Sequence, residues 1–231
     1  MRIVTWNCQQ AFRNKTAAFL SLKPDIASVQ ECSASDAKCL QPRGYSGAWF
    51  GSNPHKGVAV FCRSDWPIHP LADPCNRWIA PFRVDAPTAF TFIAVWNCKV
   101  EESAAASYIG QFHSTLVSHP EWFDRAPVVV AGDFNSNTIW DSSRAVGNHS
   151  SVVAMLKSVG LVSTYHAFRN EEHGRESRST LYLYRKKKIR FHLDYIFAPE
   201  SWPIRRASVG THHKWCQLSD HCPILADLAH E

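Results

Sequence analysis

The sequence contains no run of about 18 consecutive apolar residues, the length that a helix needs to cross a membrane. Its first ten residues, MRIVTWNCQQ, turn polar after the sixth, so we expect no signal-peptide core there. The chain also lacks internal repeats, low-complexity tracts and an interdomain linker. We therefore expect a cytoplasmic, monomeric protein without a membrane span, folded as a single domain over residues 1–231.

None of the eight cysteines belongs to a Cys-x2-Cys pair, the spacing typical of zinc sites and redox motifs. Four of them lie in or beside apolar strand-like runs, which favours buried thiols over disulfides or a zinc site: Cys8, Cys62, Cys98 and Cys222. Charged residues make up only 19% of the chain, and the net charge is +5. This modest excess is compatible with an anionic partner such as nucleic acid or a phosphorylated metabolite.

Apolar residues, at 45%, fall into short strand-like runs separated by stretches with helical periodicity. We expect strands at residues 2–6, 25–31, 57–63, 90–100, 127–132, 179–185, 190–198, 204–210 and 222–228. We expect helices at residues 11–22, 104–119 and 149–161, which Pro24, Pro120 and Gly160 end. The sequence thus predicts a mixed α/β protein with polar clusters at its strand ends.

Five polar clusters contain side chains able to bind a metal or a phosphate. They are TWN (Asn7), VQE (Glu31), AGDFNSN (Asp133, Asn135, Asn137), HLDYIF (Asp194) and LSDH (Asp220, His221). Mg²⁺ prefers oxygen ligands and is typically held by one or two carboxylates together with substrate phosphates. Taken singly, each cluster also has a structural explanation, such as a turn asparagine, a solvated strand end, an ion pair or a cap.

In this order, the set WN, QE, GDFN, LDYIF and SDH resembles the endonuclease/exonuclease/phosphatase superfamily, over almost the whole chain from Asn7 to His221. The resemblance implies a four-layer α/β sandwich, in which two mainly antiparallel sheets pack face to face with helices outside. It also implies a phosphoric ester hydrolase that uses Mg²⁺, or Mn²⁺ in its place. The principal metal ligand would be Glu31, with Asn7 beside it and Asp220 near the metal or the leaving group.

The resemblance further implies catalytic roles. Asp133 would activate the attacking water, and Asn135 would hold a phosphate oxygen. His221 would donate to the scissile phosphate, while Asp194 fixes and charges its imidazole. These are the groups that phosphate-ester hydrolysis requires in addition to the metal.

Substrate contacts are expected on less specific signals. In IAVWNCKV, where many superfamily members place a His or Tyr that touches the phosphate, either Asn97 contacts a phosphate oxygen or Trp96 simply packs. Further candidate substrate-binding residues are Asn137, Arg178 and Lys187. Trp140 and Trp215 would either stack on a base or pack at the rim.

The segment YRKKKIRFH, residues 184–192, carries five cations that lead into the run bearing Asp194. It would either overhang the cleft and contact a polyanionic backbone or form a solvated turn. A nuclease acting on DNA or RNA is therefore the leading interpretation. A phosphatase or phosphodiesterase for a small molecule or lipid headgroup stays open, since QECSAS lacks the Thr-Lys usual in abasic-site endonucleases. An inactive nucleic-acid-binding member is disfavoured, because no expected catalytic carboxylate or histidine is missing.

Overall fold

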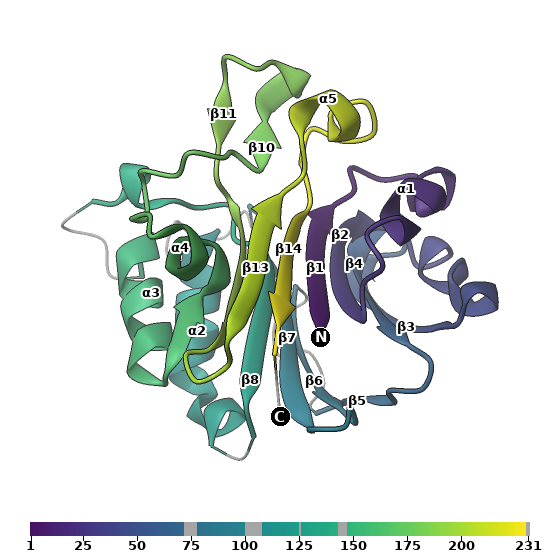
Figure 1. Cartoon of the computed structure of the whole chain (residues 1–231), viewed down its shortest axis with the longest axis horizontal. Helices are drawn as coiled ribbons and strands as arrows, with labels where there is room; N and C mark the ends of the chain where they lie inside the picture. The colour runs from purple at the N-terminus through teal and green to yellow at the C-terminus, as the bar shows by residue number, and fades with distance from the viewer. Residues whose placement is uncertain (72–77, 100–107, 125, 143–146, 230–231) are drawn as a thin grey trace.

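The computed structural model describes residues 1–71, 78–99, 108–124, 126–142 and 147–229, which form two six-stranded sheets and a short hairpin (Figure 1). The first sheet has the order β13 (Ile204–Val209), β14 (Ile224–Leu228), β1 (Arg2–Asn7), β2 (Ile26–Cys32), β4 (Lys56–Arg63), β3 (Tyr45–Asn53). The second has the order β5 (Ile68–Pro70), β6 (Ile79–Val84), β7 (Phe90–Trp96), β8 (Val128–Asp133), β12 (Asp194–Pro199), β9 (Leu161–Ser163). The hairpin pairs β10 (Leu181–Tyr182) with β11 (Arg190–Phe191).

Most neighbouring strands run antiparallel. Within the described residues, the only parallel pairs are β1–β2 in the first sheet and β7–β8 in the second. The expectation of two mainly antiparallel sheets is confirmed.

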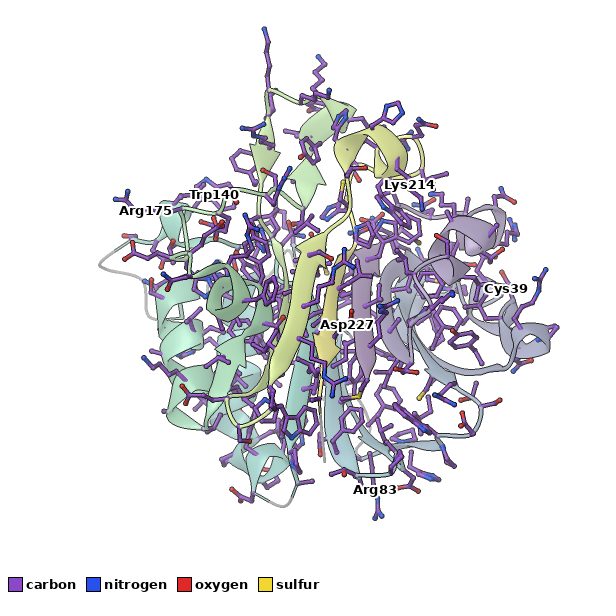
Figure 2. The ribbon with its side chains drawn as sticks, viewed as in Figure 1. Cys39, Arg83, Trp140, Arg175, Lys214 and Asp227 are labelled. Carbon is purple, nitrogen blue, oxygen red and sulfur yellow. The ribbon has the colours of Figure 1, made fainter. Side chains whose placement is uncertain are left out.

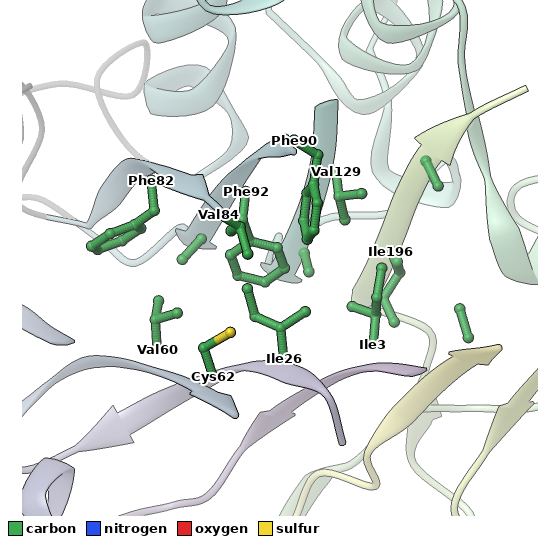
Figure 3. Close-up of a cluster of buried hydrophobic side chains, with 14 of the residues drawn as sticks. Ile3, Ile26, Val60, Cys62, Phe82, Val84, Phe90, Phe92, Val129 and Ile196 are labelled. Atoms are coloured by element: carbon green, nitrogen blue, oxygen red, sulfur yellow. The ribbon is translucent and has the colours of Figure 1, made fainter. Parts of the chain in front are cut away.

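The alternation of side chains along each strand builds the layers. Ile3 and Ile26 of the first sheet meet Phe92 and Val129 of the second in one apolar cluster between the sheets (Figure 3). The neighbouring side chains along the same strands point outward, as Val4 does toward the helical side of the first sheet. Each such buried side chain contributes roughly 1.5–3 kcal/mol relative to an exposed one. The predicted sandwich is therefore the observed architecture.

Helices cover the outer faces. On the first sheet, the cluster of Val4 and Ala27 includes Phe19 of α1 (Thr16–Leu20) and Trp215 of α5 (His212–Trp215). On the second sheet, buried residues of α2 (Ile109–Ser118) and α3 (His149–Ser158) complete another cluster. The remaining helix, α4 (Thr164–Arg169), follows β9 directly. No helix among the described residues combines the length and apolarity of a membrane span.

Several predicted elements are shorter than expected. The run at 11–22 splits into a 3-10 turn at Phe12–Asn14 and the short helix α1, following a left-handed Ala11 with φ +48°. The prediction of a continuous strand at 179–185 is wrong, because after β10 the chain turns through Tyr184 at φ +55°. The strand at 190–198 is interrupted at His192 and Leu193, between β11 and β12.

Other boundaries also shift. Helix α2 starts at Ile109, and the predicted residues 104–107, like residue 100 of the predicted strand 90–100, lie outside the described residues. The helix predicted at 149–161 ends at Ser158, with Gly160 left-handed at φ +77°, as expected of a glycine that follows a helix end. Strands β3, β5, β6 and β9 were not predicted.

Candidate active site

Five strands of the two sheets bring polar side chains to one end of the sandwich. Asn7 and Asp133 are the last residues of β1 and β8, and Glu31 lies near the end of β2. Asp194 begins β12 and pairs in register with Asp133, because β12 runs antiparallel to β8. His221 precedes β14, which runs antiparallel to β1. The topology therefore gathers residues that are up to 214 positions apart, from Asn7 to His221.

Asn7 connects carboxylates from both sheets. Its Nδ2 donates to Asp133 Oδ2 at 3.0 Å and to Glu31 Oε1 at 3.4 Å. Asp133 is fully buried, whereas the Glu31 side chain keeps 19% of its surface exposed. Asn135 lies on the other side of Asp133 and donates its backbone N–H to Oδ1 at 2.9 Å. These contacts fix the Asp133 carboxylate from two directions.

Two of these residues adopt a left-handed backbone conformation, which is uncommon for residues other than glycine. Glu31 has φ +57° at an irregularity in the pairing of β2 with β4, and Asn135 has φ +48°. Such conformations cost of order 1–3 kcal/mol each and cluster at functional sites. Gly132 is needed for a different reason, since a Cβ there would collide with the carbonyl of Val95 on β7.

His221 and Asp194 form a buried pair. His221 Nδ1 lies 2.9 Å from Asp194 Oδ2, and Asp194 is fully buried. The backbone of His221 is also held, because its N–H donates to Ser219 Oγ and its carbonyl accepts from Trp6 Nε1. With Nδ1 engaged, Nε2 is the ring nitrogen left to donate to a ligand.

The site strongly shifts two ionisation equilibria. Burial by itself lowers the pKa of His221, but the charge and hydrogen bond of Asp194, with the charge of Asp133, outweigh it and raise the pKa to about 10. Burial, and then repulsion from Asp194, raises the pKa of Asp133 to about 7. His221 is therefore an imidazolium at neutral pH, and Asp133 is poised to take up a proton.

The donor set suits a hard divalent cation. Glu31 and Asp133 offer carboxylate oxygens, the ligands that Mg²⁺ prefers, and the Nδ2 of Asn7 donates to both. The Oδ1 of Asn7 accepts the backbone N–H of Gln9 at 3.1 Å. Asp133, Asp194 and His221 also have ligand-type atoms within 4.8 Å of one another. Because the ring of His221 is already paired with Asp194, the cluster around Glu31 is the better match to an oxygen-only site.

Lys56 is a site residue that the sequence did not indicate. Its Nζ lies 3.2 Å from Glu31 Oε1 and 5.2 Å from the centre of the Trp96 ring. Nothing but its place before the run 57–63 marked it in the sequence. The carboxylate of Glu31 therefore already has a cationic neighbour from the protein itself.

Two further candidates, Asn97 and Asp220, lie next to residues of the site. Asn97 is fully buried beside Asp133, whose carbonyl accepts its backbone N–H, while Asn97 Oδ1 has no partner among the described residues. Asp220 is half-buried, and its carbonyl accepts from Tyr182 of the hairpin. Asn97 therefore lies beside the site, and Asp220 joins His221, the next residue, to the hairpin.

The other candidates have different surroundings. Asn137 is buried and donates to Glu176 and to the Tyr195 hydroxyl, which places it in a neighbouring polar cluster. Arg178 and Lys187 are exposed, and their substrate contacts stay predictions. The idea that Trp215 stacks on a base is wrong, because its ring is buried against Trp6 at 5.0 Å.

Comparison with known proteins gives the same architecture. The chain is similar to the 3'-5' exonuclease NExo of Neisseria meningitidis, with TM-score 0.73 and 20% identity over 100% of both chains. It is similar to an AP endonuclease of Archaeoglobus fulgidus, with TM-score 0.71 and 19% identity, again over 100% of both chains. TDP2 of D. rerio, complexed with a single-strand DNA product, has TM-score 0.68 and 16% identity over 100% of this chain and 99% of that one.

A search of curated proteins finds no match. The model of the Endonuclease/Exonuclease/phosphatase family, by contrast, matches residues 4–221. Members of this family hydrolyse phosphoester bonds, and its nucleases generally use divalent metals. Since the match spans all five polar clusters and most of the chain, this protein belongs to the Endonuclease/Exonuclease/phosphatase family.

Proposed function

We propose that residues 1–231 form a single catalytic domain that hydrolyses phosphodiester bonds of DNA or RNA with a bound divalent cation. The proposal rests on one observation: Asn7 donates to both Glu31 and Asp133, next to the Asp194–His221 pair. This combination provides a metal ligand set, a base and a fixed cationic donor within one site. A cytoplasmic, monomeric state stays a prediction from the sequence.

Glu31 would hold the cation, with Asn7 and Asp220 beside it. The ion would be Mg²⁺ or Mn²⁺, and when bound it would supply positive charge against the phosphate and the leaving oxygen. The half-exposed position of Glu31 supports this role, because a substrate phosphate must reach the same ion.

The protein's own residues would carry the proton and charge transfers. Asp133, with a pKa of about 7, would take the proton of a water whose oxygen attacks phosphorus. The bond to the leaving oxygen breaks opposite the new bond, and that oxygen is then protonated from solvent. His221 would donate through Nε2 to a phosphate oxygen, held by Asp194, and Asn135 would contact another.

Charge and exposed aromatics near this end favour a nucleic acid. The hairpin of β10 and β11 projects from the sandwich beside α5 (Figure 1), and Arg185, in the 3-10 turn after β10, donates to Gln9, which follows β1. Its cations are exposed: Arg185, Lys186, Lys187, Lys188 and Arg190. Figure 2 shows Trp140 toward the same end. This residue is 51% exposed, and the centre of its ring lies 4.9 Å from that of Phe191. A nucleobase could stack on the Trp140 ring while the phosphates of the nucleic-acid backbone contact the lysines of the hairpin.

A substrate panel with and without EDTA tests the proposal. It compares single- and double-stranded DNA, RNA, an abasic duplex and small phosphodiesters, each with Mg²⁺ or Mn²⁺. We expect cleavage of a nucleic acid that EDTA abolishes and added Mg²⁺ restores. Glu31→Gln and His221→Asn should each lose it, while the exposed Glu200→Gln and His213→Asn serve as controls. Turnover of small phosphodiesters alone would contradict the nuclease assignment, and metal-independent cleavage would contradict the mechanism.

A further inference from the structure

A second polar cluster lies outside the candidate active site, and the proposed mechanism does not use it. It consists of four imidazoles and one carboxylate: His149, His166, His173, His192 and Glu176. They come from α3, α4, the loop after α4 and the segment before β12. The ring of Tyr195 packs against all four imidazoles, at centroid distances of 4.9–6.0 Å. Segments far apart in the sequence thus place imidazoles around one point of the fold.

Three of the rings are anchored in the same way. In each, Nδ1 contacts an oxygen at 2.7–2.8 Å: His149 with Ser136 Oγ, His166 with Ser163 Oγ, and His192 with the Arg178 carbonyl. Metal-binding histidines typically engage one ring nitrogen in this way, so that the other presents its lone pair to the metal. The anchoring leaves Nε2 of all three rings as the available ligand atom.

The remaining atoms lie close enough for several of them to share one ion, although the rings of His166 and His173 stack at 3.6 Å and one ring must turn before both lone pairs point at it. His166 Nε2 lies 3.1 Å from Glu176 Oε1, and His149 Nε2 lies 3.1 Å from His173 Nδ1. Ligand atoms of His166, His173 and Glu176 lie within 4.8 Å of one another. Two ligands bound tetrahedrally at zinc distances of about 2.0–2.1 Å are themselves separated by about 3.3 Å.

His192 supplies an independent indication. The residue is only 3% exposed, and its Nε2 is buried without a hydrogen-bond partner among the described residues. The Nδ1 contact with a carbonyl oxygen requires a proton on Nδ1, which leaves an unsatisfied lone pair on Nε2. A buried acceptor without a donor is costly, and the ring lies 5.6 Å from that of His166. A metal ion bound by His166, His173 and Glu176 would satisfy this lone pair once the His192 ring moves toward it, since His192 is not among the ligand atoms that lie within 4.8 Å of one another.

The surroundings of the carboxylate also suit a metal. Glu176 Oε1 accepts from His166 Nε2 at 3.1 Å and from the Gly174 N–H at 2.9 Å, which holds it among the imidazoles. A dication bound by one carboxylate and neutral imidazoles leaves a net positive charge, and the half-exposed His173 gives solvent access to it.

We propose that His166, His173 and Glu176, with His149 or His192 as the fourth ligand, form a zinc site separate from the catalytic cation. A nitrogen-rich set with one carboxylate favours zinc over magnesium, which prefers oxygen ligands throughout. The ion would join the loop after α4 to α3 and to the start of β12. It would also support the segment after β8, because Asn137 Nδ2 donates to Glu176 Oε1 at 2.9 Å.

Direct metal binding tests the site without relying on activity. The purified chain is stripped with a chelator, titrated with Zn²⁺ against a chromophoric competitor, and assayed for metal content by mass spectrometry. We expect one zinc equivalent and a higher Tm on binding. Co²⁺ in its place should give the intense visible bands of a tetrahedral ion, and Glu31→Gln should keep this zinc while losing nuclease activity, which separates the two proposals.

Matched variants assign the ligands. His173→Asn and Glu176→Gln should weaken zinc binding at least about tenfold, whereas Glu172→Gln in the same loop and the exposed His213→Asn should not. His149→Asn and His192→Asn identify the fourth ligand by which of them weakens zinc binding. Circular dichroism shows that each variant is folded, and His173 is half-exposed, so its replacement is structurally mild. The proposal would be overturned if the wild type does not bind zinc, or if the His173 and Glu176 variants bind zinc as tightly as the wild type does.

Discussion

Asn7 and Asp133 come from different sheets, yet their side chains meet, with Asn7 Nδ2 at 3.0 Å from Asp133 Oδ2. Asn7 ends β1 of the first sheet, and Asp133 ends β8 of the second. The candidate active centre therefore depends on how the two sheets pack, and the apolar layer between them sets this distance. Any variant that shifts one sheet against the other should lower activity without touching a catalytic residue.

Replacing Asp194 with asparagine should lower kcat by roughly 10²–10⁴-fold while the fold is retained. The change removes the charge that keeps His221 protonated, and it also removes repulsion on Asp133. Both pKa values should therefore fall, and the whole pH–rate profile should move toward lower pH. Steady-state kinetics between pH 5 and 10 check the shift. Near-wild-type turnover, or an unshifted profile, would refute the pairing.

The same pair predicts how the stability of the metal-free protein depends on pH. Folded His221 keeps its proton up to about pH 10, whereas the unfolded chain releases it near 6.5. The folded state thus binds more protons in this window, so the stability from the pair is complete below about 6.5 and is lost as pH rises toward 10. One proton gives a slope of at most about 1.4 kcal/mol per pH unit.

Urea denaturation of metal-free protein at several pH values measures this slope. The double variant Asp194→Asn/His221→Asn is the reference, because it lacks the ion pair but keeps the buried cysteines and tyrosines that titrate at high pH. We expect the free energy of unfolding of the wild type to fall more steeply than that of the double variant. Parallel curves would show that His221 is not held as an imidazolium.

How much the sequence predicted depends on whether a residue borders a strongly apolar strand. Glu31, Asp133 and Asp194 adjoin buried runs, so their common location follows once those runs form the centres of two sheets. Lys56 could not be found in this way, because a lysine before a strand is usually solvated and only the fold brings it to Glu31. Asn137 looked equivalent to Asn135 in GDFNSN, but the chain turns between them.

The hairpin and the histidine cluster show two other limits. The apolar alternation in LYLY predicted a long strand, yet left-handed residues at Tyr184 and Arg185 turn the chain after two residues. The cluster around His166 draws on four segments, each with an ordinary isolated histidine. Non-local convergence of this kind carries no local signal in spacing or periodicity.

Lys56→Met should tighten binding of the catalytic divalent cation. The ammonium lies 3.2 Å from Glu31 Oε1, so it repels an incoming cation and competes for the carboxylate. For such a half-exposed pair, about 1 kcal/mol, or about fivefold in Kd, is the expected gain. Mn²⁺ titration followed by electron paramagnetic resonance measures it, with the exposed Lys157→Met as control. Weaker binding would mean that Lys56 supports the metal site instead.

Neutralising the hairpin should weaken nucleic-acid binding in a salt-dependent way. Lys186, Lys187 and Lys188 are exposed on the projecting β10–β11 hairpin, where each could contact one phosphate. Replacing all three with glutamine should reduce the slope of log K against log salt by up to about 2.7 for duplex DNA, or about 2.1 for single strands.

Fluorescence anisotropy of a labelled oligonucleotide across a salt series, with Ca²⁺ in place of Mg²⁺ to prevent cleavage, measures the slope. The triple change Lys23→Gln, Lys38→Gln and Lys157→Gln removes the same charge from exposed positions outside the hairpin and should leave the slope nearly unchanged. If both triple variants lose affinity equally, binding reflects net charge alone. If neither triple variant loses affinity, the hairpin is a solvated turn. The nucleic acid must then bind through the strand-end loops and Trp140.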